Sequence, residues 1–286
     1  MSSGTLYVVA TPLGNLEDVT LRALRVLKEV DLIAAEDTRH SRKLLLHFGI
    51  ATPLTSYYDQ IERRKAPQLI EALKRGKSVA LISDAGTPGI ADPGFHLVHA
   101  AIAAGVRVEA VPGPSAVAAA VSVAGLATDR FAFDGFVPVK PGARRRFFEA
   151  VAHEPRTVVV YEAARRLVAC LHDVQAVLGN RPVVVVRELT KLFEEIVRGP
   201  VADILAQLQE RAAAATLQGE VTLLIGAGAP AATLVDAAEL SAAIQRLRAA
   251  GLSLKEIART LAHERGLSRR EVYQAGLALG HDDEVS

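Results

Sequence analysis

Cysteine, tryptophan and methionine are scarce in this chain of 286 residues, which holds one cysteine, one methionine and no tryptophan. With Cys170 as the single cysteine, a disulfide within the chain and a cysteine-rich metal site are both excluded, which fits a reducing compartment. Cys170 lies in a helical apolar pattern and is expected to be a small core residue. No metal site is predicted.

An excess of charge of either sign is also missing, because 33 Lys and Arg balance 32 Asp and Glu to a formal net charge of +1. Contact with a polyanion must therefore come from local basic clusters. The densest cluster opens an expected helix, where the helix dipole disfavours positive charge, and a structural role for all three of its arginines is hard to find. This favours an anionic partner over a solvated helix face for Arg144, Arg145 and Arg146. A second cluster comprises Arg39, Arg42 and Lys43.

Long hydrophobic runs are absent as well. The most apolar window, residues 111–127, contains prolines and a glycine and falls short of the roughly 20 residues that a membrane-spanning helix needs. The first residues show no basic segment followed by a long apolar one, as a secretory signal would. A cytoplasmic protein without a membrane partner is expected.

Half of the residues are apolar, and short apolar strands alternate with helical patterns, which is typical of α/β domains. We predict two such domains, residues 1–126 and 127–228, followed by a Gly- and Ala-rich linker and a helical extension over 233–286. Capping boxes at Ser253 and Ser268 start the last two helices of the extension, which is expected to resemble a helix-turn-helix unit.

Three loops rich in Gly, Pro and Ser follow predicted strands of the first domain: residues 11–15, 83–94 and 112–115. Open α/β sheets bind ligands at the carboxyl ends of their strands, so a ligand site is predicted where these loops meet. Gly86 allows the backbone to approach a ligand closely, and Asp92 is expected to cap the next helix. The first loop lacks the glycine spacing of a dinucleotide site.

A pair of acids, Glu36 and Asp37, ends another predicted strand. The pair could belong to a ligand site, or Asp37 could cap the helix that follows. The sequence leaves both readings open.

Several segments, in their order along the chain and in their amino-acid sequences, resemble the tetrapyrrole methylase superfamily. Within it they resemble the branch that acts on ribosomal RNA. The segments are T-P-L-G-N-L (11–16), A-E-D-T-R (35–39), S-D-A-G-T-P-G-I-A-D-P-G (83–94), P-G-P-S-A (112–116), F-D-G-F-V-P (133–138), V-Y-E (160–162), E-L-T-K-L-F-E-E (188–195) and G-E-V-T-L-L-I (219–225). Porphyrin-type relatives carry G-D-P where this chain has Gly86-Thr87-Pro88, which argues against a corrinoid or porphyrin substrate.

The resemblance implies two α/β domains of the tetrapyrrole methylase type with S-adenosylmethionine in the cleft between them, and a homodimer. It implies methylation of the ribose 2′-oxygen of a cytidine in the decoding region of 16S rRNA, within the small ribosomal subunit. Two alternatives remain: a tetrapyrrole methyltransferase of the same fold, and a non-enzymatic nucleic-acid binder that uses the terminal helices.

Carried onto this sequence, the implied cofactor-binding residues are Pro12, Asp84, Ala85, Gly86, Thr87, Ile90, Ser115, Ala116, Glu162, Leu189 and Thr222. The two basic clusters would contact the RNA. A ribose hydroxyl is a weak nucleophile, so a general base or a nearby cation would help the transfer. Candidates at strand ends are Asp37, Lys191 and Glu194, each of which could instead be structural or RNA-binding.

Overall fold

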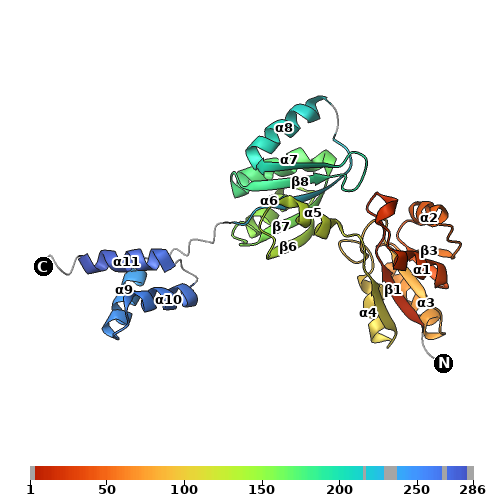
Figure 1. Cartoon of the computed structure of the whole chain (residues 1–286), viewed down its shortest axis with the longest axis horizontal. Coiled ribbons are helices and arrows are strands. Elements are labelled where there is room, and N and C mark those ends of the chain that lie inside the picture. Colours follow the sequence, from red (N-terminus) through yellow and green to blue (C-terminus); the bar gives the residue numbers. More distant parts are fainter. Residues whose placement is uncertain (1–3, 215–216, 229–236, 266–268, 282–286) are drawn as a thin grey trace. The chain divides into compact units, whose positions relative to one another are not determined.

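The computed structural model describes residues 4–214, 217–228, 237–265 and 269–281, and the chain divides into two compact units, residues 1–227 and 228–286. Among these described residues, the first unit contains two five-stranded sheets with helices around them, and the second contains three helices (Figure 1). The predicted α/β fold with a helical extension is confirmed. The boundary proposed after residue 126 stays a prediction.

The first sheet is wholly parallel, with the strand order β3-β2-β4-β1-β5. Its strands are β1 (Thr5–Val9), β2 (Leu32–Ala35), β3 (Leu54–Ser56), β4 (Val79–Ile82) and β5 (Arg107–Val111). The central strand β4 is buried along its whole length, as its continuous apolar run predicts. Successive side chains of β4 enter two separate cores, Val79 and Leu81 on one face and Ala80 and Ile82 on the other.

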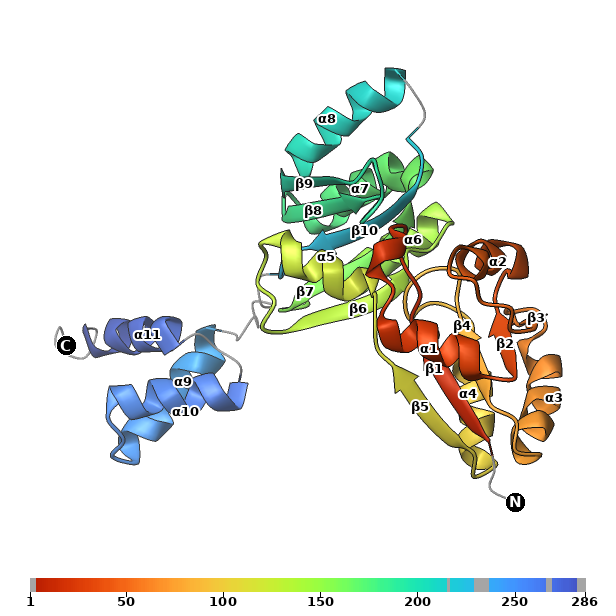
Figure 2. The same cartoon turned by 45° about the vertical axis from the view of Figure 1, so that its right-hand side comes forward.

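Helices cover both faces of this sheet (Figure 2). They are α1 (Leu21–Glu29), which follows a 3-10 turn (Leu16–Asp18), then α2 (Thr38–His47), α3 (Glu62–Lys74) and α4 (Phe95–Ala103). The expected cap of α4 is wrong, because the helix begins only after Gly94, whose φ is 149°. Asp92 therefore belongs to the preceding loop and is available to a site.

The second sheet is mixed, with the order β6-β7-β10-β8-β9 and one parallel pair, β6 with β7. Its strands are β6 (Phe131–Phe136), β7 (Thr157–Ala163), β8 (Pro182–Arg187), β9 (Glu195–Pro200) and β10 (Glu220–Ile225). One face packs against α6 (Pro141–Ala150), α7 (Ala164–Leu178) and α8 (Val201–Ala214), and Cys170 is buried in that core as expected.

The opposite face of the second sheet is covered by α5 (Ala116–Ala124). Val117 and Val121 of this helix pack with Val184 and Leu224 of the sheet. The chain therefore passes from one sheet to the other just before α5, and the start of that helix, capped by Ser115, lies between the carboxyl ends of the first sheet and the face of the second.

The sequence suggested no structural role for the three arginines at the start of α6. For Arg144 and Arg145 this prediction is wrong. Arg144 is only 6% exposed, and its Nε lies 2.7 Å from Asp173 Oδ2. Arg145 Nε donates to the other carboxylate oxygen of Asp173 at 2.8 Å. A structural role thus exists for Arg144 and Arg145, whereas Arg146 is exposed on the same helix.

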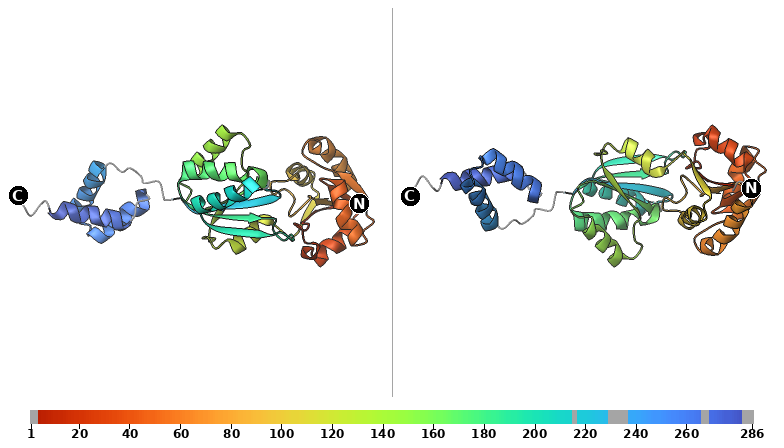
Figure 3. Two further views of the ribbon diagram at one scale, coloured as in Figure 1. Left: turned by 90° about the horizontal axis from the view of Figure 1, so that it is seen from above. Right: turned by 90° about the horizontal axis from the view of Figure 1, so that it is seen from below.

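The second unit consists of α9 (Ala237–Ala249), α10 (Leu254–Arg265) and α11 (Arg269–His281), which pack on one another (Figure 3). Ile244, Ile257 and Val272 form its core. The capping box at Ser253 is confirmed, since Ser253 N–H donates to the Glu256 carboxylate at 2.9 Å. The box at Ser268 and most of the linker lie outside the described residues. Of the helices that the structure describes, none has the length and apolar character needed to cross a membrane.

Candidate functional site

The three loops predicted to meet are joined by hydrogen bonds. Thr11 N–H donates to Gly86 O at 2.8 Å, and Gly86 N–H returns a bond to Thr11 O at 3.0 Å. Thr87 Oγ1 donates to Pro114 O at 3.0 Å, which adds the third loop. The carboxyl ends of β1, β4 and β5 therefore carry one continuous loop surface.

Gly86 is required at this junction by its backbone and by its neighbours. Its φ is 77°, in the left-handed region that favours glycine. A Cβ at this position would lie 3.2 Å from Leu13 Cδ2 and 3.7 Å from Pro114 O. A side chain here would therefore strain the loop and press on Leu13, while its distance from Pro114 would be an ordinary van der Waals contact.

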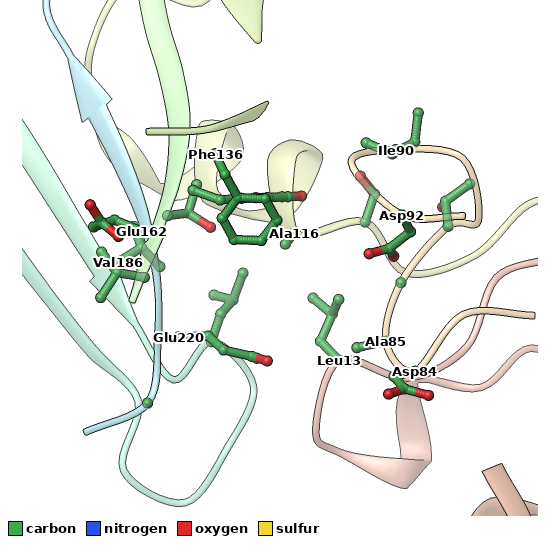
Figure 4. Close-up of a pocket in the computed structure, with 18 of the residues that line it drawn as sticks. Leu13, Asp84, Ala85, Ile90, Asp92, Ala116, Phe136, Glu162, Val186 and Glu220 are labelled. Carbon is green, nitrogen blue, oxygen red and sulfur yellow. The ribbon is translucent and has the colours of Figure 1, made fainter. Parts of the chain in front are cut away.

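A cavity of about 320 Å³ lies between these loops and the second sheet (Figure 4). We call it the main cavity. Every residue that the resemblance implied for the cofactor lines it, except Pro12, and the second sheet contributes Glu162, Leu189 and Thr222. That these residues contact a cofactor stays a prediction, but the structure brings them together around one space.

The lining of the main cavity is acidic. Its ionisable carboxylates are Glu36, Asp84, Asp92, Glu162 and Glu220, and no Lys, Arg or His is among its lining residues. Burial, together with the charges of Asp92 and Asp84, raises the pKa of Glu36 to about 7. Burial, opposed by a hydrogen bond from Ser83, raises the pKa of Asp92 to about 6. Crowded carboxylates of this kind favour a positively charged ligand.

Glu162 lines the main cavity from β7, but its side chain lies on the face of the second sheet that packs against α7. Its side chain is fully buried, and Oε1 accepts hydrogen bonds from Ala163 N–H and Arg166 Nε, each at 2.7 Å. Oε2 is buried and has no partner among the described residues. A buried acceptor without a partner is costly, and here it lies on the α7 side of the sheet.

Several lining residues were not among the predicted site residues: Asp92, Phe136, Tyr161 and Glu220. Glu36 was named only as one of two acids that could belong to a ligand site. Phe136 and Tyr161 form an apolar wall, with ring centroids 5.3 Å apart. The available signal was position, because Glu36 directly follows β2 and Glu220 begins β10.

Of the two acids after β2, Asp37 is the helix cap. Its carboxylate accepts the Arg39 N–H at 2.8 Å and pairs with the Arg39 guanidinium at 2.9 Å. These hydrogen bonds lower the pKa of Asp37 to about 2, which makes it a poor proton acceptor at neutral pH. Asp37 does not line the main cavity, whereas its neighbour Glu36 does.

Lys191 and Glu194 lie in the loop between β8 and β9. Lys191 Nζ is 3.0 Å from Glu188 Oε1 and 3.1 Å from Glu220 Oε2. Burial alone would lower the pKa of Lys191, but the two carboxylates outweigh it and raise the pKa, so this group is a cation and not a base. Glu194 is exposed and accepts the Thr190 N–H at 2.6 Å.

A second cavity of about 520 Å³ adjoins the main one, and we call it the α2 cavity. It is lined by Pro12, by residues of α2 that include Lys43, and by Lys191. Of the residues predicted to bind RNA, Lys43 reaches this cavity, while Arg39 is 91% exposed at the start of α2 and paired with Asp37. Within the described residues no group of three or more His, Cys, Asp or Glu side chains is arranged to hold a metal ion.

Comparison with known proteins gives consistent matches. Residues 5–205 match the family of tetrapyrrole (corrin/porphyrin) methylases. The chain is 49% identical to the ribosomal RNA small subunit methyltransferase I of Pseudomonas aeruginosa, over 97% of this chain and 98% of that one. It is 45% identical to the protein of the same name from Synechocystis, over 98% and 99% of the two chains.

Solved structures of lower identity share the fold. A uroporphyrin-III C-methyltransferase from Thermus thermophilus, complexed with S-adenosylhomocysteine, aligns with a TM-score of 0.56 at 22% identity, over 78% of this chain and 97% of that one. The methyltransferase CobJ aligns with a TM-score of 0.59 at 18% identity, over 79% and 95%. With the loops, the two sheets and the near full-length relatives all in agreement, this chain belongs to the tetrapyrrole (corrin/porphyrin) methylase family, in the group of the ribosomal RNA small subunit methyltransferases I.

Proposed function

We propose that the chain uses S-adenosylmethionine to methylate the ribose 2′-oxygen of a cytidine in the decoding region of 16S rRNA. The observation that carries this proposal is the main cavity, whose described lining holds the carboxylates Glu36, Asp84 and Asp92, which pair with no cation, and no basic side chain. Bound there, S-adenosylmethionine supplies a methyl group activated by a positively charged sulfonium. An acidic cavity stabilises such a cation and disfavours anionic ligands.

The residues present fit the rest of the cofactor as well. Phe136, Val186 and Leu189 offer an apolar surface for an adenine ring. Gly86 keeps the loop backbone open to a ligand's polar atoms. The family relationship and this lining support the same cofactor.

The chain's own residues contribute mainly position and charge to the transfer. Methyl transfer is an in-line displacement, for which correct placement of the two reactants supplies a large share of the rate. Glu36 lines the cavity with a pKa near 7, so it suits a proton acceptor better than Asp37 does. We assign Glu36 to the removal of the hydroxyl proton, with Lys191 as a fixed cation nearby.

Ribosomal RNA is supported as the substrate by the relatives' names. Proteins called ribosomal RNA small subunit methyltransferase I match this chain over nearly the whole of both sequences. The solved tetrapyrrole enzymes are too distant in sequence to support more than the fold. RNA is therefore favoured over a tetrapyrrole, and an enzyme over a simple binder.

One experiment separates these possibilities. The full-length protein is incubated with methyl-labelled S-adenosylmethionine and, in parallel, with small ribosomal subunits lacking the modification, with naked 16S rRNA, and with uroporphyrinogen. The proposal predicts label in RNA and none in the tetrapyrrole. Label in the tetrapyrrole alone, or no transfer to any acceptor, would contradict it.

The homodimer implied by the family resemblance and the cytoplasmic location expected from the sequence remain part of this proposal. Sedimentation equilibrium of the full-length protein at several concentrations tests the first. A single species with the mass of one chain, 30.4 kDa, would rule the dimer out.

A further inference from the structure

The α2 cavity opens beside the main cavity. The two share Leu13, Asp84, Ala85 and Glu220 among their lining residues, so the loops that form one wall of the main cavity also form a wall of the α2 cavity. A reactant that receives a methyl group must lie directly beside the donor. The α2 cavity is positioned for that reactant.

Ser41 on α2 contributes a polar side chain to the lining of the α2 cavity. Its side chain lines the cavity and is only 3% exposed. Its hydroxyl has no hydrogen-bond partner among the described residues. A serine hydroxyl inside a helix often bonds back to its own helix, and here it does not. The orphaned group is explained if a ligand supplies the missing partner.

The α2 cavity has basic groups in its lining, which the main cavity lacks, beside the two shared carboxylates Asp84 and Glu220. His40, Lys43 and Lys191 supply its basic groups, and Lys191 is held as a cation by Glu188 and Glu220. Leu13, Leu16 and Leu44 supply apolar surface. Apolar walls, a few fixed polar groups and cations at the rim match a nucleotide, which has a flat base, hydroxyls and phosphates.

We propose that the α2 cavity receives the target nucleotide, turned out of the RNA strand, with the Ser41 hydroxyl bonded to its base or sugar and Lys43 facing its phosphates. This inference rests on the proposed function and adds a recognition site to it. It makes α2 the element that selects the acceptor, while the main cavity holds the donor.

The transfer balances with these groups alone. The ribose 2′-oxygen forms the new bond to the methyl carbon as the bond from that carbon to sulfur breaks, and the electron pair of the broken bond stays on sulfur. The hydroxyl proton passes to Glu36 or to solvent. The products are a 2′-O-methyl ribose, a neutral thioether and one proton.

The test is Ser41→Ala, with Ser122→Ala as the matched control. Ser122 is an exposed serine inside another helix, α5, and its hydroxyl bonds to Ala119 O. Loss of one hydrogen bond to the substrate should raise KM for RNA about fivefold in Ser41→Ala, with cofactor affinity unchanged. A structural serine would instead lower stability, whereas removal of an unsatisfied hydroxyl should leave the melting temperature the same or higher.

A second pair of variants measures the phosphate contact. Lys43→Ala should lower the slope of log affinity against log salt by about 0.7, the value of one contact to single-stranded RNA. Lys28→Ala removes an equal charge from an exposed position on α1 and should leave the slope unchanged.

The outcomes distinguish the two claims. An active wild type together with unaltered RNA kinetics in both Ser41→Ala and Lys43→Ala would overturn this inference and leave the proposed function intact. A wild type that transfers no methyl group to RNA would overturn both.

Discussion

Thr11 and Gly86 exchange both of their backbone hydrogen bonds, at 2.8 and 3.0 Å, where β1 and β4 end. The two strands run parallel, yet the residues beyond them form an antiparallel bridge. The bridge ties the loop after β1 to the glycine loop after β4 and fixes the wall that the two cavities share.

The bridge makes the cofactor affinity sensitive to the side chain at residue 86. Gly86→Val should abolish binding of S-adenosylmethionine, because a side chain at φ 77° strains the loop and meets Leu13 and Pro114. The measurement is titration calorimetry with the cofactor, alongside thermal unfolding.

Gly49→Val is the matched control. Gly49 also has a positive φ, 62°, but a Cβ there would meet open space. Both variants bear a strain of order 1–3 kcal/mol, and only the one in the cavity wall should lose the cofactor. Equal cofactor affinity in Gly86→Val and wild type would refute the assignment of the main cavity.

A second prediction concerns pH. Because the pKa of Glu36 is raised to about 7 and that of Asp92 to about 6, the main cavity gains negative charge between pH 6 and 8. Affinity for the cationic S-adenosylmethionine should therefore rise several-fold over that interval. The thioether product lacks the sulfonium charge and should show a weaker trend. Glu36→Gln should flatten the curve, and parallel curves for cofactor and product would contradict the electrostatic account.

Ionisation of Glu36 should favour cofactor binding, but it should lower the stability of the protein without cofactor. A raised folded-state pKa means that the native state binds the proton more tightly than the unfolded chain. Stability should fall as pH rises from about 4.5 to about 7. Glu36→Gln should thus stabilise the protein at pH 8, by about 1–2 kcal/mol after allowance for solvent screening, and leave it unchanged at pH 4. Denaturant unfolding at both pH values tests this.

A third prediction separates the arginines of α6. Arg144→Ala should destabilise the protein by about 3 kcal/mol, because it leaves the buried Asp173 with one partner fewer. Arg146→Ala should change stability by less than about 0.5 kcal/mol, since Arg146 is exposed. If the cluster contacts RNA, Arg146 should account for the loss of affinity. If the Arg144→Ala protein were as stable as the wild type but bound RNA more weakly, the structural role of Arg144 would be contradicted.

A fourth prediction concerns the second unit. Because residues 228–286 form a separate compact unit with their own core, a chain shortened to end at Gly228 should keep its affinity for the cofactor. Its methylation of small ribosomal subunits should decline if α9, α10 and α11 help to dock the substrate. Equal rates for the shortened and full-length proteins would exclude a docking role.

Local signals in the sequence were sufficient for much of the fold. The apolar run of β4 and the Gly-Pro loop after it predicted a buried strand and a ligand loop, and the structure has both. The Ser253 capping box was also predicted, since it depends on residues within one helical turn. β3 was missed because its three half-buried residues carry no alternation.

The features that could not be predicted depend on contacts distant in sequence. The pairing of Arg144 with Asp173 joins residues 29 positions apart. It gives Arg144 a structural role, where the basic cluster in the sequence suggested a contact with an anionic partner. Sequence position alone could not decide between Glu36 and Asp37, because the turn after β2 determines which carboxylate enters the cavity. The α2 cavity likewise arises only when the loop carrying Lys191 meets α2 and the loop after β1.

The most direct test of the central claim is the chemical position of the transferred methyl group. Small ribosomal subunits lacking the modification are labelled with the wild-type protein, and their RNA is hydrolysed with alkali, which cannot cleave the linkage next to a 2′-O-methyl ribose. The account predicts that the label is recovered in an alkali-resistant dinucleotide whose methylated residue is a cytidine from the decoding region. Label released as a single nucleotide methylated on its base would contradict it.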